Sequence, residues 1–283
     1  MIDSNVFAEL QNRGIITHTG LKAEDFTDMS KLVDYGIATS TSSEEVYKDI
    51  LEDIAQSEEV VNALAAFLEA VAAGGNVVVP MNIVLDAPLT ITKDVVLDLN
   101  GCTLKSATDV FDVSAKLTIN GDGKIFAATD NTCSWCAVFA HDNADVTING
   151  GEYSVGAPEG DYNDLIYAKD NAKITINDGI YHSSGSVRKD GTAFVLNLKD
   201  NSSASIVVNG GTFDGFNPAK ANTEPGGDYN FVADGYEAIE DPTSVWNVSK
   251  VEVVVDENKD DLNASTEGVV ETDPDGGSVE GEE

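Results

Sequence analysis

The sequence is poor in aromatic residues and in basic residues. Phe, Tyr and Trp make up 7% of its 283 residues, whereas apolar residues of all kinds make up 42%, so a core must be built mainly from aliphatic side chains. Only 16 basic residues stand against 50 acidic ones, which gives a formal net charge of −34. Because like charges repel, this balance predicts binding neither to nucleic acid nor to anionic membrane surfaces.

Cysteines and long apolar runs are also scarce. Cys102, Cys133 and Cys136 make no even set for a disulfide framework. The last two have the spacing of a metal pair, but no second Cys or His pair accompanies them, so we expect core or turn positions and neither a metal nor a cofactor. No apolar run is long enough to span a bilayer, and the first residues show no secretory signal. We therefore expect synthesis in the cytoplasm without a signal peptide.

What the sequence has instead is a repeated turn. Five apolar alternating runs each end on an asparagine followed within two residues by glycine. The alternation buries one face of a strand, and one such strand cannot bury itself. Successive asparagines are 20, 29, 28 and 32 residues apart, a spacing typical of stacked repeats rather than of one globular core. The five residues are Asn100, Asn120, Asn149, Asn177 and Asn209.

Longer alignments of the repeats predict how they stack. Residues 136–151, 164–179 and 194–211 align over their whole length as strand, Asp-Asn turn, strand, Asn-Gly turn and short strand. Asparagine and glycine both tolerate a left-handed backbone, so we expect the chain to bend at these turns. Three short strands in roughly 20 to 30 residues predict a right-handed parallel β-helix. Asparagines of successive coils are then expected to form a hydrogen-bonded ladder.

The coils are expected over residues 76–224, and residues 43–75 before them have helical spacing. A capping box begins this region and a glycine pair ends it. A helix here would cover the open end of the stack, which must not expose its core. Residues 1–42 look too short to make a core of their own. The apolar residues of the expected helical face are Val60, Val61, Leu64, Phe67, Leu68 and Val71.

Beyond the repeats, residues 225–255 are predicted to be a C-terminal cap. Phe231, Tyr236 and Trp246 are expected to close the stack, with a carbohydrate-stacking platform as the alternative role for these aromatic rings. Residues 256–283 are strongly acidic and poor in apolar residues. That composition predicts a disordered tail.

Three stretches carry a family resemblance. They are AVAAGGNVVVPMNIVLDAPLTITKDVVLDLNGCTL, the recurrent Thr-Ile-Asn turn, and GGTFDGFNPA followed by NFVADGY. Over residues 70 to 250 the chain resembles right-handed β-helix proteins of the pectate-lyase-like class. Within that class it is most similar to virion proteins of phages that infect gut Bacteroidetes, the crAss-like group among them, including proteins called head fibres.

The resemblance implies a non-enzymatic structural protein on the capsid surface of a virion, a head fibre or a capsid decoration. It implies that residues 1–42 attach to capsid or other virion proteins, and that the protein adheres to host or mucus glycans. Related fibres self-associate as trimers, although this sequence carries no trimer signature. The candidate attachment residues are Phe7, Leu10, Ile15 and Ile16.

Two other functions stay open. A phage polysaccharide depolymerase, lyase or hydrolase, needs a basic residue near an anionic substrate or a cluster of carboxylates. The only arginines are Arg13 and Arg188, and the recurring aspartates fall at turns, where aspartate caps bends, so we expect no enzyme activity and no catalytic residue. A bacterial surface adhesin is the other alternative, which an export signal would favour. The recurring aspartates are Asp142, Asp145, Asp170, Asp190 and Asp200.

Overall fold

The computed structural model describes residues 60–252 of the chain. The described residues up to Lys250 belong to one compact unit. Several predictions from the sequence lie outside the described residues, namely the attachment segment 1–42 with its four apolar residues, the start of the helical region and the acidic tail.

Residues 60–73 are helical, as the spacing of apolar residues predicts. The helix packs onto the first strands of the molecule through Phe67 and Val71, which are buried in the core, and through the partly buried Leu64. It ends at Gly74, which adopts a left-handed φ of 83° and donates its backbone N–H to the carbonyl of Ala70 at 3.1 Å. In the part of the chain that the structure describes, no helix is long and apolar enough to cross a membrane.

The predicted apolar face of this helix is wrong in part. Val60, Val61 and Leu68 are 49%, 64% and 42% exposed. A helix buries only the stripe that faces its partner. Val61 and Leu68 lie beside that stripe, and Val60 lies a turn further along the helix from the strands.

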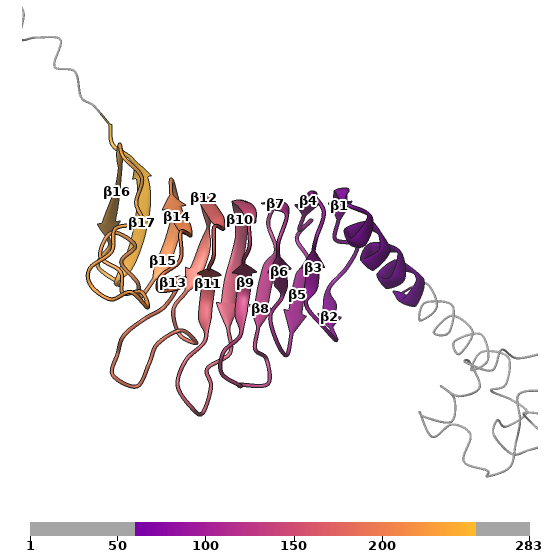
Figure 1. Ribbon diagram of the computed structural model, residues 1–283, viewed down its shortest axis with the longest axis horizontal. Coiled ribbons are helices and arrows are strands. Elements are labelled where there is room, and N and C mark those ends of the chain that lie inside the picture. The colour runs from indigo at the N-terminus through magenta and orange to yellow at the C-terminus, as the bar shows by residue number, and fades with distance from the viewer. Residues whose placement is uncertain (1–59, 253–283) are drawn as a thin grey trace, which may run out of the picture. The chain divides into compact units, whose positions relative to one another are not determined.

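After the helix the chain makes repeated passes of three short strands, and we call each pass a level. Figure 1 shows the levels side by side in chain order. The first strands of neighbouring levels pair in parallel, and so do the second strands and the third strands. First and second strands belong to a 12-stranded sheet, and third strands form a separate 5-stranded sheet. The protein is therefore mainly β, with parallel sheets.

The strand bounds follow this threefold order. The first strands are β1 (Gly75–Val78), β4 (Val95–Asp98), β7 (Lys116–Asn120), the first halves of β10 (Asp145–Val155) and β12 (Lys173–His182), and β14 (Ser205–Val208). The second strands are β2 (Ile83–Leu85), β5 (Thr103–Ser106), β8 (Lys124–Ala127), the second halves of β10 and β12, and β15 (Gly211–Asp214). The third strands are β3 (Leu89–Ile91), β6 (Phe111–Val113), β9 (Cys136–Ala140), β11 (Asp164–Ala168) and β13 (Leu196–Leu198).

The register places like residues on top of one another and so builds the core. The inward-facing apolar positions of the first strand pair with the same positions of the next level, and these side chains are buried. The alternation predicted from the sequence is thereby confirmed, because every second residue points inward. One such column is Val95, Leu117, Val146, Ile174 and Ile206.

Three of the few aromatic residues form a stack inside this core. Tyr153, Tyr181 and Phe213 follow one another in successive levels and are fully buried. Their ring centroids are 5.1 and 4.7 Å apart, and the rings are nearly parallel. The Tyr153 hydroxyl donates to the carbonyl of Gly150 at 3.0 Å, so the buried polar end of the ring is satisfied.

The predicted asparagine ladder is confirmed for four of the five residues. The side-chain amide of Asn149 donates to Asn120 at 2.8 Å, that of Asn177 to Asn149 at 2.7 Å, and that of Asn209 to Asn177 at 2.9 Å. Asn100 stays outside, because its amide reaches back to the carbonyl of Val79 at 3.2 Å.

The predicted left-handed backbone is confirmed at the glycines of these turns but, among the asparagines, only at Asn100, which has a φ of 51°. In the last three repeats the left-handed residue is the glycine two positions later, such as Gly151 with a φ of 95°. The turn is therefore a bend within a continuing strand, since β10 and β12 run through it.

The parallel stacking ends in an antiparallel hairpin. Strand β17 (Val245–Lys250) pairs antiparallel with both β15 and β16 (Tyr236–Glu240). Phe231 is buried in the core, and Tyr236 and Trp246 pack against it. The three aromatic residues predicted to close the stack do contact its core.

Candidate functional site

The outward side of the 5-stranded sheet carries a hollow of ≈510 Å³, which we call the third-sheet groove. It is larger than a second hollow on the same stack of levels. Its carboxylic acids are Asp109, Asp161, Asp164 and Glu224. Its aromatic side chains are Trp135, Phe139, Tyr162 and Tyr167.

Strand pairing brings Asp109 and Asp164 to the two sides of Cys136. Asp164 begins β11 and lies beside Cys136, the first residue of β9. On the other side of Cys136, Asp109 precedes β6 and accepts the Cys136 backbone N–H at 2.5 Å. Paired strands are about 4.8 Å apart, so the main chains of Asp109 and Asp164 are separated by about 10 Å with Cys136 between them.

Burial raises the pKa of these two carboxyl groups. Loss of water raises the pKa of Asp164 to about 7 and that of Asp109 to about 6, because the ionised form is less well solvated there. For Asp164 a hydrogen bond from the Asn197 side-chain amide, 2.9 Å long, acts in the opposite direction. The negative charge of Glu224 adds to the upward shift.

Glu224 is held from three sides. The Tyr167 hydroxyl donates to one carboxylate oxygen at 2.8 Å, and the Lys199 ammonium donates to the other at 2.6 Å. The Glu224 backbone N–H donates to the side-chain oxygen of Asn197 at 2.9 Å. The fully buried Asn197 therefore links Glu224 to Asp164, which fixes both acids on one surface.

The aromatic rings of the groove are also fixed. Phe139 and Tyr167 stack across β9 and β11 with centroids 5.8 Å apart, and the Trp135 indole N–H donates to the hydroxyl of Thr132 at 2.7 Å. Tyr162 stacks on Phe194 at 4.6 Å. Partly exposed rings beside hydrogen-bonding acids are suited to a ligand with both apolar and polar faces.

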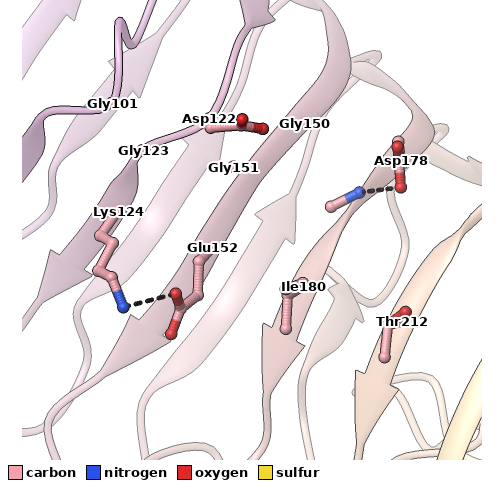
Figure 2. Close-up of a pocket in the computed structure, with 11 residues that line it drawn as sticks. Gly101, Asp122, Gly123, Lys124, Gly150, Gly151, Glu152, Asp178, Ile180 and Thr212 are labelled. Carbon is pink, nitrogen blue, oxygen red and sulfur yellow. Dashed lines mark hydrogen bonds and ion pairs between the residues drawn. The ribbon is translucent and has the colours of Figure 1, made fainter.

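A second hollow, of ≈440 Å³, lies along the outside of the asparagine corner (Figure 2). Glycines are five of its eleven lining residues, among them Gly123, Gly150 and Gly179, so much of its surface is backbone. Two of its charged groups form a pair: the Lys124 ammonium lies 2.7 Å from Glu152 and holds the pKa of that carboxyl below its usual range. This hollow offers little specific chemistry.

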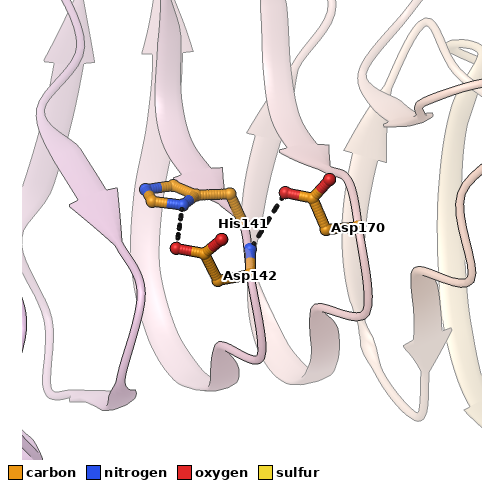
Figure 3. A group of neighbouring side chains, drawn as sticks. All are labelled: His141, Asp142 and Asp170. Carbon is orange, nitrogen blue, oxygen red and sulfur yellow. Dashed lines mark hydrogen bonds and ion pairs between the residues drawn. The ribbon is translucent and has the colours of Figure 1, made fainter.

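Figure 3 shows a cluster at the turn after β9 and β11. One ligand atom of each of His141, Asp142 and Asp170 lies within 4.8 Å of the others, close enough to hold a cation. The His141 ring also contacts Asp112 through Nε2 at 2.7 Å. Asp142 and Asp170 occupy the same left-handed turn position in successive levels, with φ values of 56° and 59°. The repeat itself therefore explains why these acids lie together, as predicted for turn aspartates.

The structure places the remaining candidate residues as follows. Cys136 is buried, and Cys133 accepts the backbone N–H of Asp161 at 3.2 Å. Both occupy core and turn positions, as the sequence suggested. The Arg188 guanidinium lies 5.3 Å from the ring centroid of Tyr162 and 3.6 Å from Asp161.

Sequence reasoning missed the clustering of Asp109, Asp164 and Glu224. These acids come from three different levels or loops, and none falls on the recurring turn. One signal was available in the aligned repeats. Cys136 and Asp164 align at the start of the third strand and differ in chemistry, whereas the residues that follow them are similar from level to level.

Comparison of the chain with protein-family models, with curated proteins and with solved structures finds no match.

Proposed function

We propose that the stacked levels form a right-handed parallel β-helix. Three supports carry this proposal: strands of the same order pair in parallel from level to level, each of the first five levels holds three strands, and connections between parallel strands of one sheet are right-handed in nearly all proteins. The asparagine ladder and the aromatic stack are the regular columns that such a fold predicts.

We infer that this β-helix is a binding protein whose ligand is a glycan held in the third-sheet groove. The observation that carries this inference is the gathering of four aromatic rings and four carboxyl groups around one hollow. The apolar face of a sugar ring packs on an aromatic ring, and its hydroxyls donate to carboxylates. A rigid parallel sheet holds these groups in place without a ligand.

We propose that the protein acts on the capsid surface of a phage virion, as a head fibre or a decoration. The motif resemblance supports this location, and the net charge of −34 suits a protein displayed in many neighbouring copies, because mutual repulsion limits aggregation. Attachment through Phe7, Leu10, Ile15 and Ile16 to a virion protein, and assembly as a trimer, are parts of the same proposal.

Glycan binding is tested by titration calorimetry with a panel of neutral and charged oligosaccharides. We expect at least one to bind, and Trp135→Ala and Tyr167→Ala to weaken it at least tenfold, which corresponds to about 1.4 kcal/mol. Tyr229→Ala is the matched control, because Tyr229 is 39% exposed and lies outside the groove. Binding that all three variants retain would place the ligand elsewhere.

The virion location is tested on particles purified by density gradient. Peptide mass spectrometry should find this chain at a constant fraction of the most abundant shell protein. Its absence from particles would overturn the proposed virion location but would not bear on glycan binding in the groove.

One observation favours a second function, hydrolysis of the bound glycan. Asp109 and Asp164 line the same groove and have different pKa values, about 6 and about 7, which is the arrangement of a base and an acid. In this function Asp164 protonates the glycosidic oxygen, and Asp109 takes a proton from the attacking water. Release of reducing ends from a bound glycan, lost in Asp164→Asn, would establish hydrolysis in place of binding alone.

A further inference from the structure

Two acids of the third-sheet groove have no cationic partner. Of its four carboxyl groups, Glu224 contacts Lys199 and Asp161 contacts Arg188. Among the described residues, no Lys, Arg or His side chain lies within ion-pair distance of Asp109 or Asp164. Lys199 is already shared, since its ammonium also lies 3.2 Å from Asp200.

These two acids differ from the many acids on the rest of the surface because they are partly buried. Solvated carboxylates need no partner, but a carboxylate that loses water is stabilised by a nearby positive charge. Burial raises the pKa values of Asp109 and Asp164, and no ion pair within the molecule offsets that loss of solvation. A cation bound between them would replace the lost solvation.

The rings of the groove already bind cations within the molecule. The Lys169 ammonium lies 5.1 Å from the centroid of Phe139, and the Arg188 guanidinium lies 5.3 Å from that of Tyr162. Positive groups are attracted to the faces of aromatic rings, most strongly to those of tryptophan. Trp135 and Tyr167 line the same groove and have no such partner among the described residues.

We propose that the groove selects glycans that carry a protonated amine, that is, amino sugars without an N-acetyl group. This inference rests on the proposed glycan binding and specifies its ligand class. The sugar ring packs on Trp135 and Tyr167, and the ammonium group lies between Asp109 and Asp164. Uronates and sulfated sugars are disfavoured, since all four acids of the groove repel them.

Three hexamers that differ in charge test the proposal: fully deacetylated glucosamine, N-acetylglucosamine and galacturonate. Calorimetry is performed on the full chain at a pH near 6, where the amines of the first probe are protonated and a bound ammonium displaces the proton that burial keeps on Asp164. We expect the deacetylated hexamer to bind at least tenfold more tightly than the N-acetylated one, and the galacturonate hexamer to bind most weakly. Salt raised from about 0.05 to about 0.5 M should weaken only the first interaction strongly.

Two variants locate the effect. Asp164→Asn keeps the size of the side chain and should remove most of the preference for the amine, measured as the ratio of the affinities for the two glucosamine hexamers. Asp142→Asn removes an acid at an exposed turn outside the groove and should leave the preference unchanged. Circular dichroism of each variant shows whether it is folded.

The outcomes separate this inference from the function on which it rests. If both glucosamine hexamers bind equally and Trp135→Ala weakens both, the amine preference is overturned and glycan binding stands. Tighter binding of galacturonate would also overturn the preference. If no oligosaccharide of any charge binds, the proposed function fails and this inference fails with it.

Discussion

The asparagine corner and the third-sheet groove lie on the same stack of levels but are built differently. At the corner, each level repeats the residue of the level before, and Asn120, Asn149, Asn177 and Asn209 bond in series. In the groove, the aligned positions change from one level to the next, so that Cys136 is followed by Asp164. Identical residues in successive levels form a uniform column of side chains, whereas different residues place a specific set of chemical groups side by side.

This difference separates stability from recognition within one fold. At the corner each asparagine side chain forms a hydrogen bond with the next, so few polar groups are left free to bind a ligand. The groove contains acids whose pKa values are raised by burial, which means that folding there costs free energy. Such a cost is common at binding sites, where groups are held ready for a partner. The comparison predicts that mutations in the two regions act in opposite directions.

The largest effect is expected in the aromatic stack behind the second strands. Tyr181→Ala removes a fully buried ring between Tyr153 and Phe213 and should lower the free energy of unfolding by about 3–5 kcal/mol. Urea denaturation followed by circular dichroism measures it. Tyr229→Ala is the control, because that ring is partly exposed, and should cost clearly less. Equal losses would show that the stack has no special role.

Removing an acid of the groove should instead raise the free energy of unfolding, by an amount that depends on pH. The raised pKa of Asp164 means that the folded protein keeps a proton that the unfolded chain releases above about pH 4. Its stabilising contribution is complete below that pH and is lost as the pH rises through about 7. Relative to wild type, Asp164→Asn should therefore become more stable between about pH 4 and 8, on the order of 2–4 kcal/mol.

Unfolding curves at several pH values measure this difference. Asp142→Asn, at an exposed turn outside the groove, controls for the removal of one negative charge. If the difference in free energy of unfolding between Asp164→Asn and wild type did not change with pH, burial of Asp164 would carry no free-energy cost.

The corner should tolerate little added volume. A Cβ at Gly210 would lie 2.3 Å from the backbone oxygen of Asn177 in the level before, so Gly210→Ala must push two levels apart. We expect a loss of about 1–3 kcal/mol in urea denaturation. Gly160→Ala is the counterpart beside the groove, where the nearest atom is the movable thiol of Cys133 at 3.0 Å. If Gly160→Ala cost as much, close stacking would not distinguish the regions.

The smallest effect concerns the ladder itself. Asn149→Ala removes two side-chain hydrogen bonds, one to Asn120 and one from Asn177. Because this residue is exposed, water replaces part of the loss, and we expect about 1 kcal/mol in the same denaturation assay. Asn143→Ala, which loses one bond of 3.3 Å from Asn171, should cost less. A larger cost for Asn143→Ala would contradict the role of the ladder.

Part of the fold was predictable from particular residues. The runs ending at Asn149 and Asn177 contain the alternation, the spacing and the stacking asparagine, and the structure confirms all three. The helix before the first level and the contact of Phe231 with the core were also predictable from apolar spacing and composition. Asn100 was not distinguishable from its counterparts, since only its left-handed backbone directs the amide to Val79.

The sequence by itself determined that strands alternate, that they repeat, and that asparagines stack, because these properties depend on local periodicity and on the identity of equivalent residues. Tertiary structure alone decided that Asp109, Asp164 and Glu224 share one groove. Their distances along the chain follow no period. Asp109 and Asp164 meet because parallel pairing places β6, β9 and β11 side by side, and Glu224 joins them through its hydrogen bond to Asn197 of β13. Burial then raises the pKa values of Asp109 and Asp164, which no linear pattern encodes.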